Sequence, residues 1–131
     1  NKEGLKQSDS WFSRFKVDYR WHIEAYYRVP YNTSIAAVKQ IIWQYGTLEV
    51  GSEWYSSWMT SGAVLKEPDY TAGGHAWRIT GWDDNYGFEL TNSWGVWWGK
   101  GGKSFLPYKT FSKYVLPYGD VWKLIDSLEY K

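Results

Sequence analysis

The clearest hydrophobic pattern in this chain is a helical one that ends at Gly46. Asn32, Thr33 or Ser34 can cap the first turn of the predicted helix, and Gly46 stands where a helix commonly stops. The apolar positions between them recur at spacings of three and four residues: Ile35, Val38, Ile41, Ile42 and Tyr45. A helix with one apolar stripe packs on a flat surface, so we expect a sheet beneath it.

On both sides of that helix the hydrophobic positions alternate, which indicates β-strands. Residues 21–29 form a predicted strand that Pro30 closes, and residues 47–54 place Leu48, Val50, Ser52 and Trp54 on one face. Further strands are predicted at residues 62–65, 75–82, 87–93, 103–106 and 119–126. These short strands with tight turns predict an α+β domain, namely an antiparallel open β-barrel or half-barrel with one packed helix.

The composition bounds the size and class of the protein. A chain of 131 residues with 44% apolar content can bury one sizeable core, and we expect that domain to span residues 21–131. The 15 basic and 14 acidic side chains nearly balance, which argues against a nucleic-acid-binding protein. No apolar run approaches the ~20 residues of a membrane-spanning helix. The first residue is Asn rather than Met, so the sequence looks like a processed product or a partial one.

Two residue types limit the possible chemistry. The chain has no cysteine, which excludes disulfides and thiolate metal sites, and its two histidines, His22 and His75, lie far apart in the sequence. We therefore predict no metal and no cofactor. The 11 Trp and 12 Tyr residues are unusually many, and such side chains suit cores, interfaces and carbohydrate platforms alike.

The turn-rich segment 83–87 predicts a hairpin that brings two distant polar residues together. In an antiparallel pair the numbers of facing residues have a constant sum, here about 167 to 171 depending on the turn. His75 must then face a residue near 92 to 96, so we expect His75 and Asn92 to touch. An Asn beside a His can accept the ring N–H and leave the other ring nitrogen free for proton transfer.

The neighbours of this pair favour a functional site over a structural one. Gly73 and Gly74 directly before His75 remove side chains that would block access to the imidazole. Trp94, two residues after Asn92, can cover the His–Asn hydrogen bond and keep water away from it. A His oriented by a neutral Asn is typical of a Cys–His–Asn constellation, in which a thiolate and an imidazolium already balance each other's charge.

These residues also carry a family resemblance. The stretch GGHAWRITGW from Gly73, followed by NSWGVWWGKGG from Asn92, closely resembles the His and Asn motifs of papain-like cysteine peptidases. The likeness covers roughly residues 22–126, and residues 105–108 (FLPY) are similar to the end of the barrel in bacterial and phage-type members. It implies that His75 is the general base and acid and that Asn92 orients it.

The resemblance also implies what this chain does not contain. In the family the nucleophilic Cys begins a long helix of another, helical domain, with an oxyanion-hole Gln shortly before it, and nothing here resembles that region. We expect the match to be with the C-terminal half only, with residues 1–20 as a possible tail of the missing half. Another chain or a lost N-terminal half would supply the Cys and Gln, the substrate would be a protein or peptide, and this chain alone would be inactive.

The resemblance further implies substrate-binding positions, and two other functions stay open. Trp94 would line the leaving-group side, whereas Gly51, Gly73, Gly74 and Ala76 would border a roomy pocket for the residue preceding the scissile one. The first alternative is a pseudo-peptidase that keeps the fold as a structural or interaction module. The second is an aromatic-rich carbohydrate or cell-wall binding module, which exposed coplanar Trp rings would favour.

Overall fold

A computed structural model describes residues 23–118 and 120–126 of the chain. The expected tail at residues 1–20 lies outside the described residues. The chain divides into two compact units, residues 28–123 and residues 1–27 with 124–131. The described part of the smaller unit comprises residues 23–27, from β1 (Ile23–Arg28), and residues 124–126, from the end of β6 (Asp120–Asp126). All other elements belong to the larger unit, in which the functional residues lie.

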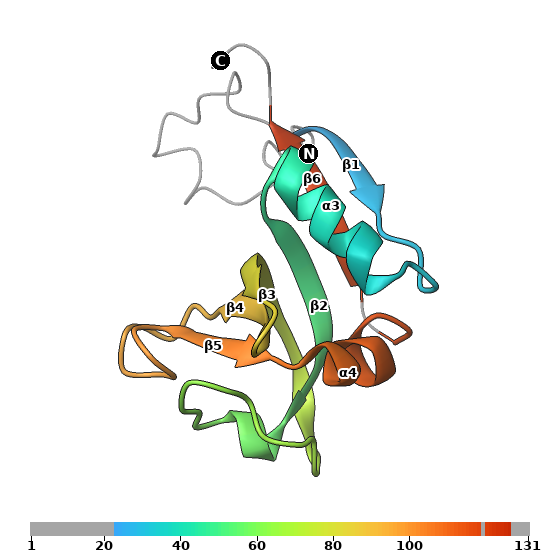
Figure 1. The fold of residues 1–131 in the computed structure, drawn as a ribbon. Helices are drawn as coiled ribbons and strands as arrows, with labels where there is room; N and C mark the ends of the chain where they lie inside the picture. The colour runs from blue at the N-terminus through green and yellow to red at the C-terminus, as the bar shows by residue number, and fades with distance from the viewer. Residues whose placement is uncertain (1–22, 119, 127–131) are drawn as a thin grey trace, which may run out of the picture. The chain divides into compact units, whose positions relative to one another are not determined.

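The strands form one six-stranded sheet with the order β1-β6-β2-β3-β4-β5 (Figure 1). The larger unit contains β2 (Leu48–Tyr55), β3 (Thr71–Asp83), β4 (Gly87–Thr91) and β5 (Lys103–Leu106). Their pairings are antiparallel, and the first residues of β6 pair antiparallel with β2. The predicted α+β class with an open antiparallel sheet is confirmed.

Helix α3 (Ile35–Tyr45) begins and ends where the sequence predicts. The Ser34 hydroxyl accepts a hydrogen bond from the backbone N–H of Ala37 at 3.1 Å, and Gly46 closes the helix with a φ of 91°. Val38 and Ile42 are buried, so the predicted stripe packs into the core. Tyr45, expected on the same stripe, is exposed, because a tyrosine at a helix end can keep its hydroxyl in water.

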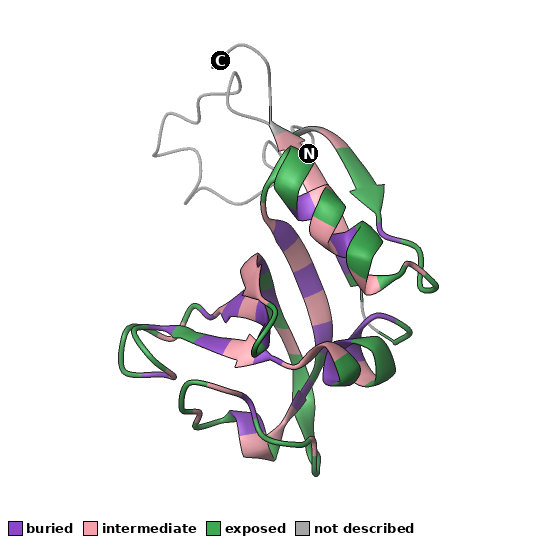
Figure 2. Cartoon of the chain, in the orientation of Figure 1, coloured by how far each residue is buried: buried purple, intermediate pink, exposed green. Residues whose placement is uncertain are grey.

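The core lies on one face of the sheet, as the alternation in β2 predicts. Figure 2 shows buried and partly buried positions alternating along β2, and the buried ones are Leu48, Val50, Ser52 and Trp54. Partners from the neighbouring strands complete this face: Trp77, Ile79, Phe88, Leu90, Ser104 and Leu106. Most are large and apolar, and the burial of each such side chain stabilises the fold by roughly 1.5–3 kcal/mol.

Two segments differ from the sequence expectation. Residues 62–65 do not form a strand: Val64 makes a single bridge to Phe105, and residues 65–69 have no regular secondary structure. Residues 108–115, for which no helix was predicted, are helical, with α4 (Tyr108–Thr110) continuing into a π-helical turn, η2 (Phe111–Val115). Phe111 and Val115 are fully buried and, with Tyr108, stand at helical spacings of three and four residues, a repeat of only two turns that did not lead to a helix prediction.

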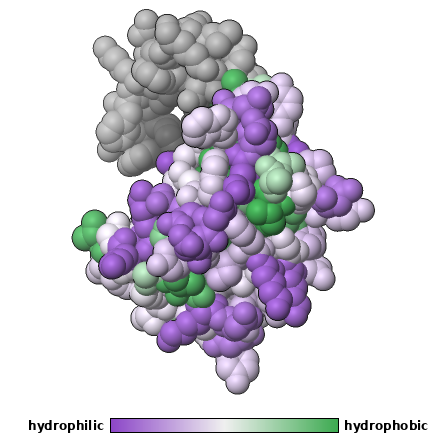
Figure 3. All heavy atoms as spheres, in the orientation of Figure 1, coloured by the Kyte–Doolittle hydropathy of each residue, from purple (hydrophilic) through white to green (hydrophobic). Residues whose placement is uncertain are grey.

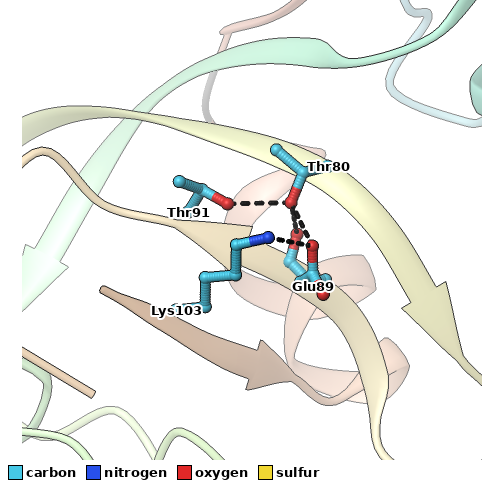
Figure 4. Close-up of polar contacts among 4 residues, drawn as sticks. All are labelled: Thr80, Glu89, Thr91 and Lys103. Atoms are coloured by element: carbon cyan, nitrogen blue, oxygen red, sulfur yellow. Dashed lines mark hydrogen bonds and ion pairs between the residues drawn. The ribbon is translucent and has the colours of Figure 1, made fainter. Parts of the chain in front are cut away.

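The opposite face of the sheet carries polar side chains that join β3, β4 and β5 (Figure 4). The Thr80 hydroxyl donates to Glu89 Oε1 at 2.6 Å and lies 2.8 Å from the Thr91 hydroxyl, while Lys103 Nζ donates to the same Glu89 oxygen at 3.2 Å. The hydrogen bond from Thr80, with a smaller contribution from Lys103, holds the pKa of Glu89 below its ordinary value. On the side of the molecule in Figure 3, hydrophobic residues appear only in small separate groups.

Candidate active site

The glycine-rich loop after β4 is held in place by backbone contacts and a buried indole. The Asn92 N–H donates to the Gly102 carbonyl at 3.0 Å, and Trp98 Nε1 donates to the Trp58 carbonyl at 3.0 Å. Gly99 has a φ of 61°, and a Cβ there would lie 2.2 Å from the Lys103 carbonyl oxygen. Only glycine fits such a position, so this sequence fixes the path of the loop that carries Asn92 and Trp94.

The register of the β3–β4 hairpin brings His75 and Asn92 together. The numbers of facing residues sum to 169 at Arg78 and Thr91 and to 170 at Trp82 and Phe88, within the predicted range. The sum changes from 169 to 170 at an irregularity of the strand between Ile79 and Gly81. If the sum of 169 is continued beyond the paired residues, Trp94 lies directly opposite His75. Asn92 is then a diagonal neighbour of His75. His75 Nε2 and Asn92 Oδ1 lie 2.8 Å apart, so the predicted contact is confirmed.

The hydrogen bonds of Asn92 determine which nitrogen of His75 carries the proton. Asn92 Oδ1 also accepts a hydrogen bond from the backbone N–H of Ser93 at 2.8 Å. A backbone N–H can only donate, so the atom that it meets must be the amide oxygen and not the amide nitrogen. His75 Nε2 must then be the donor to that oxygen. The other ring nitrogen, Nδ1, is therefore the one left to accept or deliver a proton.

Two indole rings enclose the imidazole. The ring centroids of His75 and Trp94 lie 4.8 Å apart, as the predicted cover requires, and those of His75 and Trp54 lie 4.6 Å apart. The two indoles also contact each other at 5.6 Å with an interplanar angle of 75°. Trp54 is only 2% exposed and faces Gly73 across the strands. The rings limit the access of water to the His–Asn hydrogen bond, which strengthens it.

Sequence reasoning placed Trp54 on the core face of β2 but did not connect it with His75. The alternation of β2 gives only the face of a residue, whereas its neighbour depends on the register between β2 and β3. Ser52, directly opposite His75, and Gly73, opposite Trp54, are set by that same register. One feature of the sequence could have indicated this contact: Trp54 is the last residue of the alternating run that precedes the His75 motif.

Neither serine beside the pair is arranged as a nucleophile. The Ser52 hydroxyl accepts a hydrogen bond from Trp77 Nε1 at 2.8 Å and donates its own proton to the Glu53 carbonyl at 2.9 Å. Its proton is thus directed to the backbone and not to the imidazole. Ser93 is exposed and lines a groove on the reverse side of the strand from His75. Activation by a base requires a direct hydrogen bond, which neither hydroxyl makes with His75.

The small residues predicted to bind substrate lie on both faces of the β2–β3 ladder. Gly51 pairs with Ala76, and Gly74 pairs with Glu53, on the face opposite His75. Gly73 lies on the His75 face, and a Cβ at Gly51 or Gly73 would have no atom of a non-neighbouring residue within 4 Å. Of these four residues, Ala76 lines a groove of about 430 Å³, together with Glu49, Trp77, Arg78, Thr91, Asn92 and Ser93. The groove is therefore lined by Asn92 but not by His75.

The remaining chemistry of the described residues is limited. Within residues 23–118 and 120–126, no three His, Asp or Glu side chains are grouped so that they could hold a metal ion. Over the same residues, no helix has the length and apolar character needed to cross a membrane. Asn92 Nδ2 is buried and has no hydrogen-bond partner in the described part of the chain. A buried N–H without an acceptor lowers the stability of the fold, so the packing of its neighbours alone does not explain why an Asn stands here.

Solved structures that match this fold include several cysteine proteases. Xylellain, a cysteine protease from Xylella fastidiosa, is 27% identical with a TM-score of 0.68, and the match covers 79% of this chain and 40% of xylellain. The bromelain protease from Ananas comosus, solved with the E64 inhibitor, is 22% identical with a TM-score of 0.62, covering 79% of this chain and 51% of that one. Procathepsin B from Trypanosoma congolense is 16% identical with a TM-score of 0.64, covering 81% and 37%.

The comparisons establish the fold and its extent. No protein-family model and no curated protein sequence matches the chain. The three structures described above are papain-like cysteine proteases, so the larger part of this chain has a papain-like domain fold. The chain spans between about two fifths and half of the length of the three proteases described above.

Proposed function

We propose that this chain supplies the His and Asn of a papain-like cysteine peptidase of the bacterial and phage type, corresponding to its C-terminal half. In this proposal residues 21–131 form the barrel domain and residues 1–20 are the tail of the helical half. His75 is the general base and acid, and Asn92 orients it. The single observation that carries the proposal is the hydrogen bond of 2.8 Å between His75 Nε2 and Asn92 Oδ1.

The fixed tautomer supports these roles. Because Ser93 N–H holds the amide oxygen of Asn92 in place, the imidazole presents Nδ1 as its free nitrogen. A thiol that approaches Nδ1 transfers its proton there and becomes a thiolate, the form of cysteine that attacks carbonyl carbons. Trp54 and Trp94 hold the ring on two sides, which limits its rotation away from that position.

This chain has no cysteine, so the nucleophile of the proposed reaction comes from outside it. The thiolate adds to the scissile carbonyl, and the developing oxyanion is stabilised by donors that include the Gln expected from the same helical half. The C–N bond then breaks, and the imidazolium of His75 gives its proton to the leaving amine. Water, deprotonated by His75, next adds to the thioester and releases the acid and the thiolate.

Two alternatives keep the same fold. A pseudo-peptidase would bind a partner without chemistry, and the oriented His75–Asn92 pair speaks against it, because a module without chemistry has no use for an imidazole held in one tautomer. A carbohydrate module would need a pair of exposed coplanar rings. Trp94 and Trp97 are parallel within 8°, but only Trp97 is well exposed, since Trp94 packs against His75.

Peptide hydrolysis tests the proposal in two proteins. The 131-residue chain alone is expected to be inert, whereas a chimera that joins it to the part of xylellain that it does not cover is expected to cleave peptides. That cleavage should disappear after thiol alkylation and in the His75→Ala variant of the chimera. A chimera that folds and carries an alkylatable thiol but cleaves nothing would support the pseudo-peptidase. Cleavage by the chain alone that survives alkylation and needs His75 would place the nucleophile within this chain.

A further inference from the structure

Strand β3 contains a bulge at Ala72, shortly before His75. The numbers of facing residues in β2 and β3 sum to 127 along most of the ladder but to 126 at Tyr55 and Thr71. Ala72 is therefore an extra residue that has no partner in β2. Gly73, directly after it, has a φ of 118°, a conformation that favours glycine. Bulges re-aim the side chains that follow them, and His75 is such a side chain.

The bulge decides on which face of the sheet His75 lies. Residues that face each other across antiparallel strands point to the same side, so His75, opposite the buried Ser52, lies on the core face. Thr71 faces Tyr55 and lies on the opposite face. In a regular strand Thr71 and His75, four positions apart, would share one face. The extra residue therefore separates them and leaves His75 on the side where it meets Asn92.

Two hydrogen bonds hold the bulge from the opposite face. The Thr71 hydroxyl donates to Glu53 Oε2, and its oxygen accepts the Gly73 N–H at 3.3 Å. Glu53 faces Gly74, so its side chain is a diagonal neighbour of Thr71 on that face. Without the extra residue Thr71 would point to the core face and away from Glu53. The contact between Glu53 and Thr71 therefore stabilises only the register that aims His75.

We propose that Glu53 and Thr71 are positioning residues, which fix the bulge at Ala72 and thereby hold His75 within hydrogen-bonding reach of Asn92. This inference rests on the proposed function for the role of His75, and it adds two residues that lie outside the His and Asn motifs. Both side chains are exposed and lie on the other face of the sheet from the imidazole. Their effect on His75 passes through the backbone of residues 72–75.

Hydrogen exchange of the His75 ring N–H tests the inference, because this proton reaches water only when the bond to Asn92 opens. The full chain is labelled with ¹⁵N, and exchange at His75 Nε2 and at the Gly73 amide is measured by NMR. At an exposed position, a hydrogen bond to a charged acceptor changes an equilibrium constant by about tenfold. We expect Thr71→Val and Glu53→Leu each to speed both exchanges about tenfold. The double variant should match the single ones, because both changes break the same bond.

Three variants serve as controls. Thr71→Ser keeps the hydroxyl and Glu53→Gln keeps a side-chain oxygen, so both should stay within about threefold of the parent chain. Thr80→Val breaks another hydrogen bond between a Thr of β3 and a Glu on the same face of the sheet, which joins Thr80 to Glu89 at 2.6 Å. This third variant should lower the stability of the fold without speeding exchange at His75.

Three results would overturn the inference. The first is exchange at His75 that stays within about twofold of the parent chain in both Thr71→Val and Glu53→Leu. The second is an equal increase in Thr80→Val, since exchange would then follow general stability. The third is additive effects in the double variant. A xylellain chimera that is inert while exchange responds as expected rejects only the peptidase. A chimera that cleaves peptides while exchange ignores both residues rejects only this inference.

Discussion

Replacing Asn92 by Ala removes the one acceptor that serves two donors in the site. Asn92 Oδ1 receives the ring N–H of His75 and the backbone N–H of Ser93, each at 2.8 Å. Asn92 itself is only 9% exposed, so an alanine there leaves a small space behind the imidazole. The change therefore tests both the stability of the site and the tautomer of His75.

The expected loss of stability is a balance of three contributions. A buried donor left without an acceptor costs about 1–3 kcal/mol, and the His75 ring N–H, beneath two indoles, is the more enclosed of the two donors. Ser93 is exposed, so water can replace its lost partner at a cost near the lower end of that range. The buried Asn92 Nδ2, which has no partner in the described residues, disappears and returns about 1 kcal/mol. We expect Asn92→Ala to lower the free energy of unfolding by about 2 kcal/mol.

Urea unfolding and ¹⁵N NMR of the imidazole measure the two effects. The parent chain should show the neutral imidazole with its proton on Nε2, and Asn92→Ala should show a mixture of both tautomers. Asn92→Asp keeps an oxygen at the Oδ1 position and should preserve the tautomer, which separates loss of the acceptor from loss of volume. If Asn92→Ala unfolds at the same urea concentration as the parent and keeps the Nε2–H tautomer, the hydrogen bond does not orient His75 and the assigned roles are wrong.

Four further substitutions test the fold. Ile42→Ala should cost ~2–5 kcal/mol in urea unfolding, because Ile42 is 7% exposed in the core; a cost below about 1 kcal/mol would contradict the packing of α3. Gly99→Ala should cost more than about 3 kcal/mol, since its Cβ would strike backbone, whereas Gly101→Ala, at a similar φ of 64° with open space around it, should cost about 1–2 kcal/mol; equal losses would refute the close approach. Thr80→Val should cost about 1 kcal/mol at pH 7. Because the pKa of Glu89 is held below its ordinary value of 4.5, that stabilisation is present above pH 4.5 and is lost as the pH falls through the lower folded-state pKa; a difference that does not shrink in acid would contradict it.

The sequence alone determined the features that depend on neighbours along the chain. Ser34 and Gly46 set the ends of α3, because capping involves residues three or four positions apart. The alternation in β2 set its buried face, because side chains of a strand point to opposite sides in turn. The short turn after Asp83 set the hairpin register within a few residues, and with it the contact of His75 and Asn92.

Local pattern failed where packing decides the conformation. Residues 108–115 form a helix that buries Phe111 and Val115, although their apolar repeat spans only two turns, which is short for a helix prediction. Residues 62–65 have strand-like composition, yet pairing limited to one bridge with Phe105 does not extend them into a strand. In both segments the stabilising contacts come from distant parts of the chain, which periodicity does not record.

Only the tertiary structure decided the details on which the proposed chemistry depends. Trp54 encloses His75 because β2 pairs with β3 in one particular register, and a shift by one residue would turn its ring to the other face. The free nitrogen of His75 is Nδ1 because Ser93 N–H fixes the amide of Asn92, a contact of atoms rather than of residue types. The sequence names the residues of this site through local spacing, whereas distances and donor directions exist only after the sheet has formed.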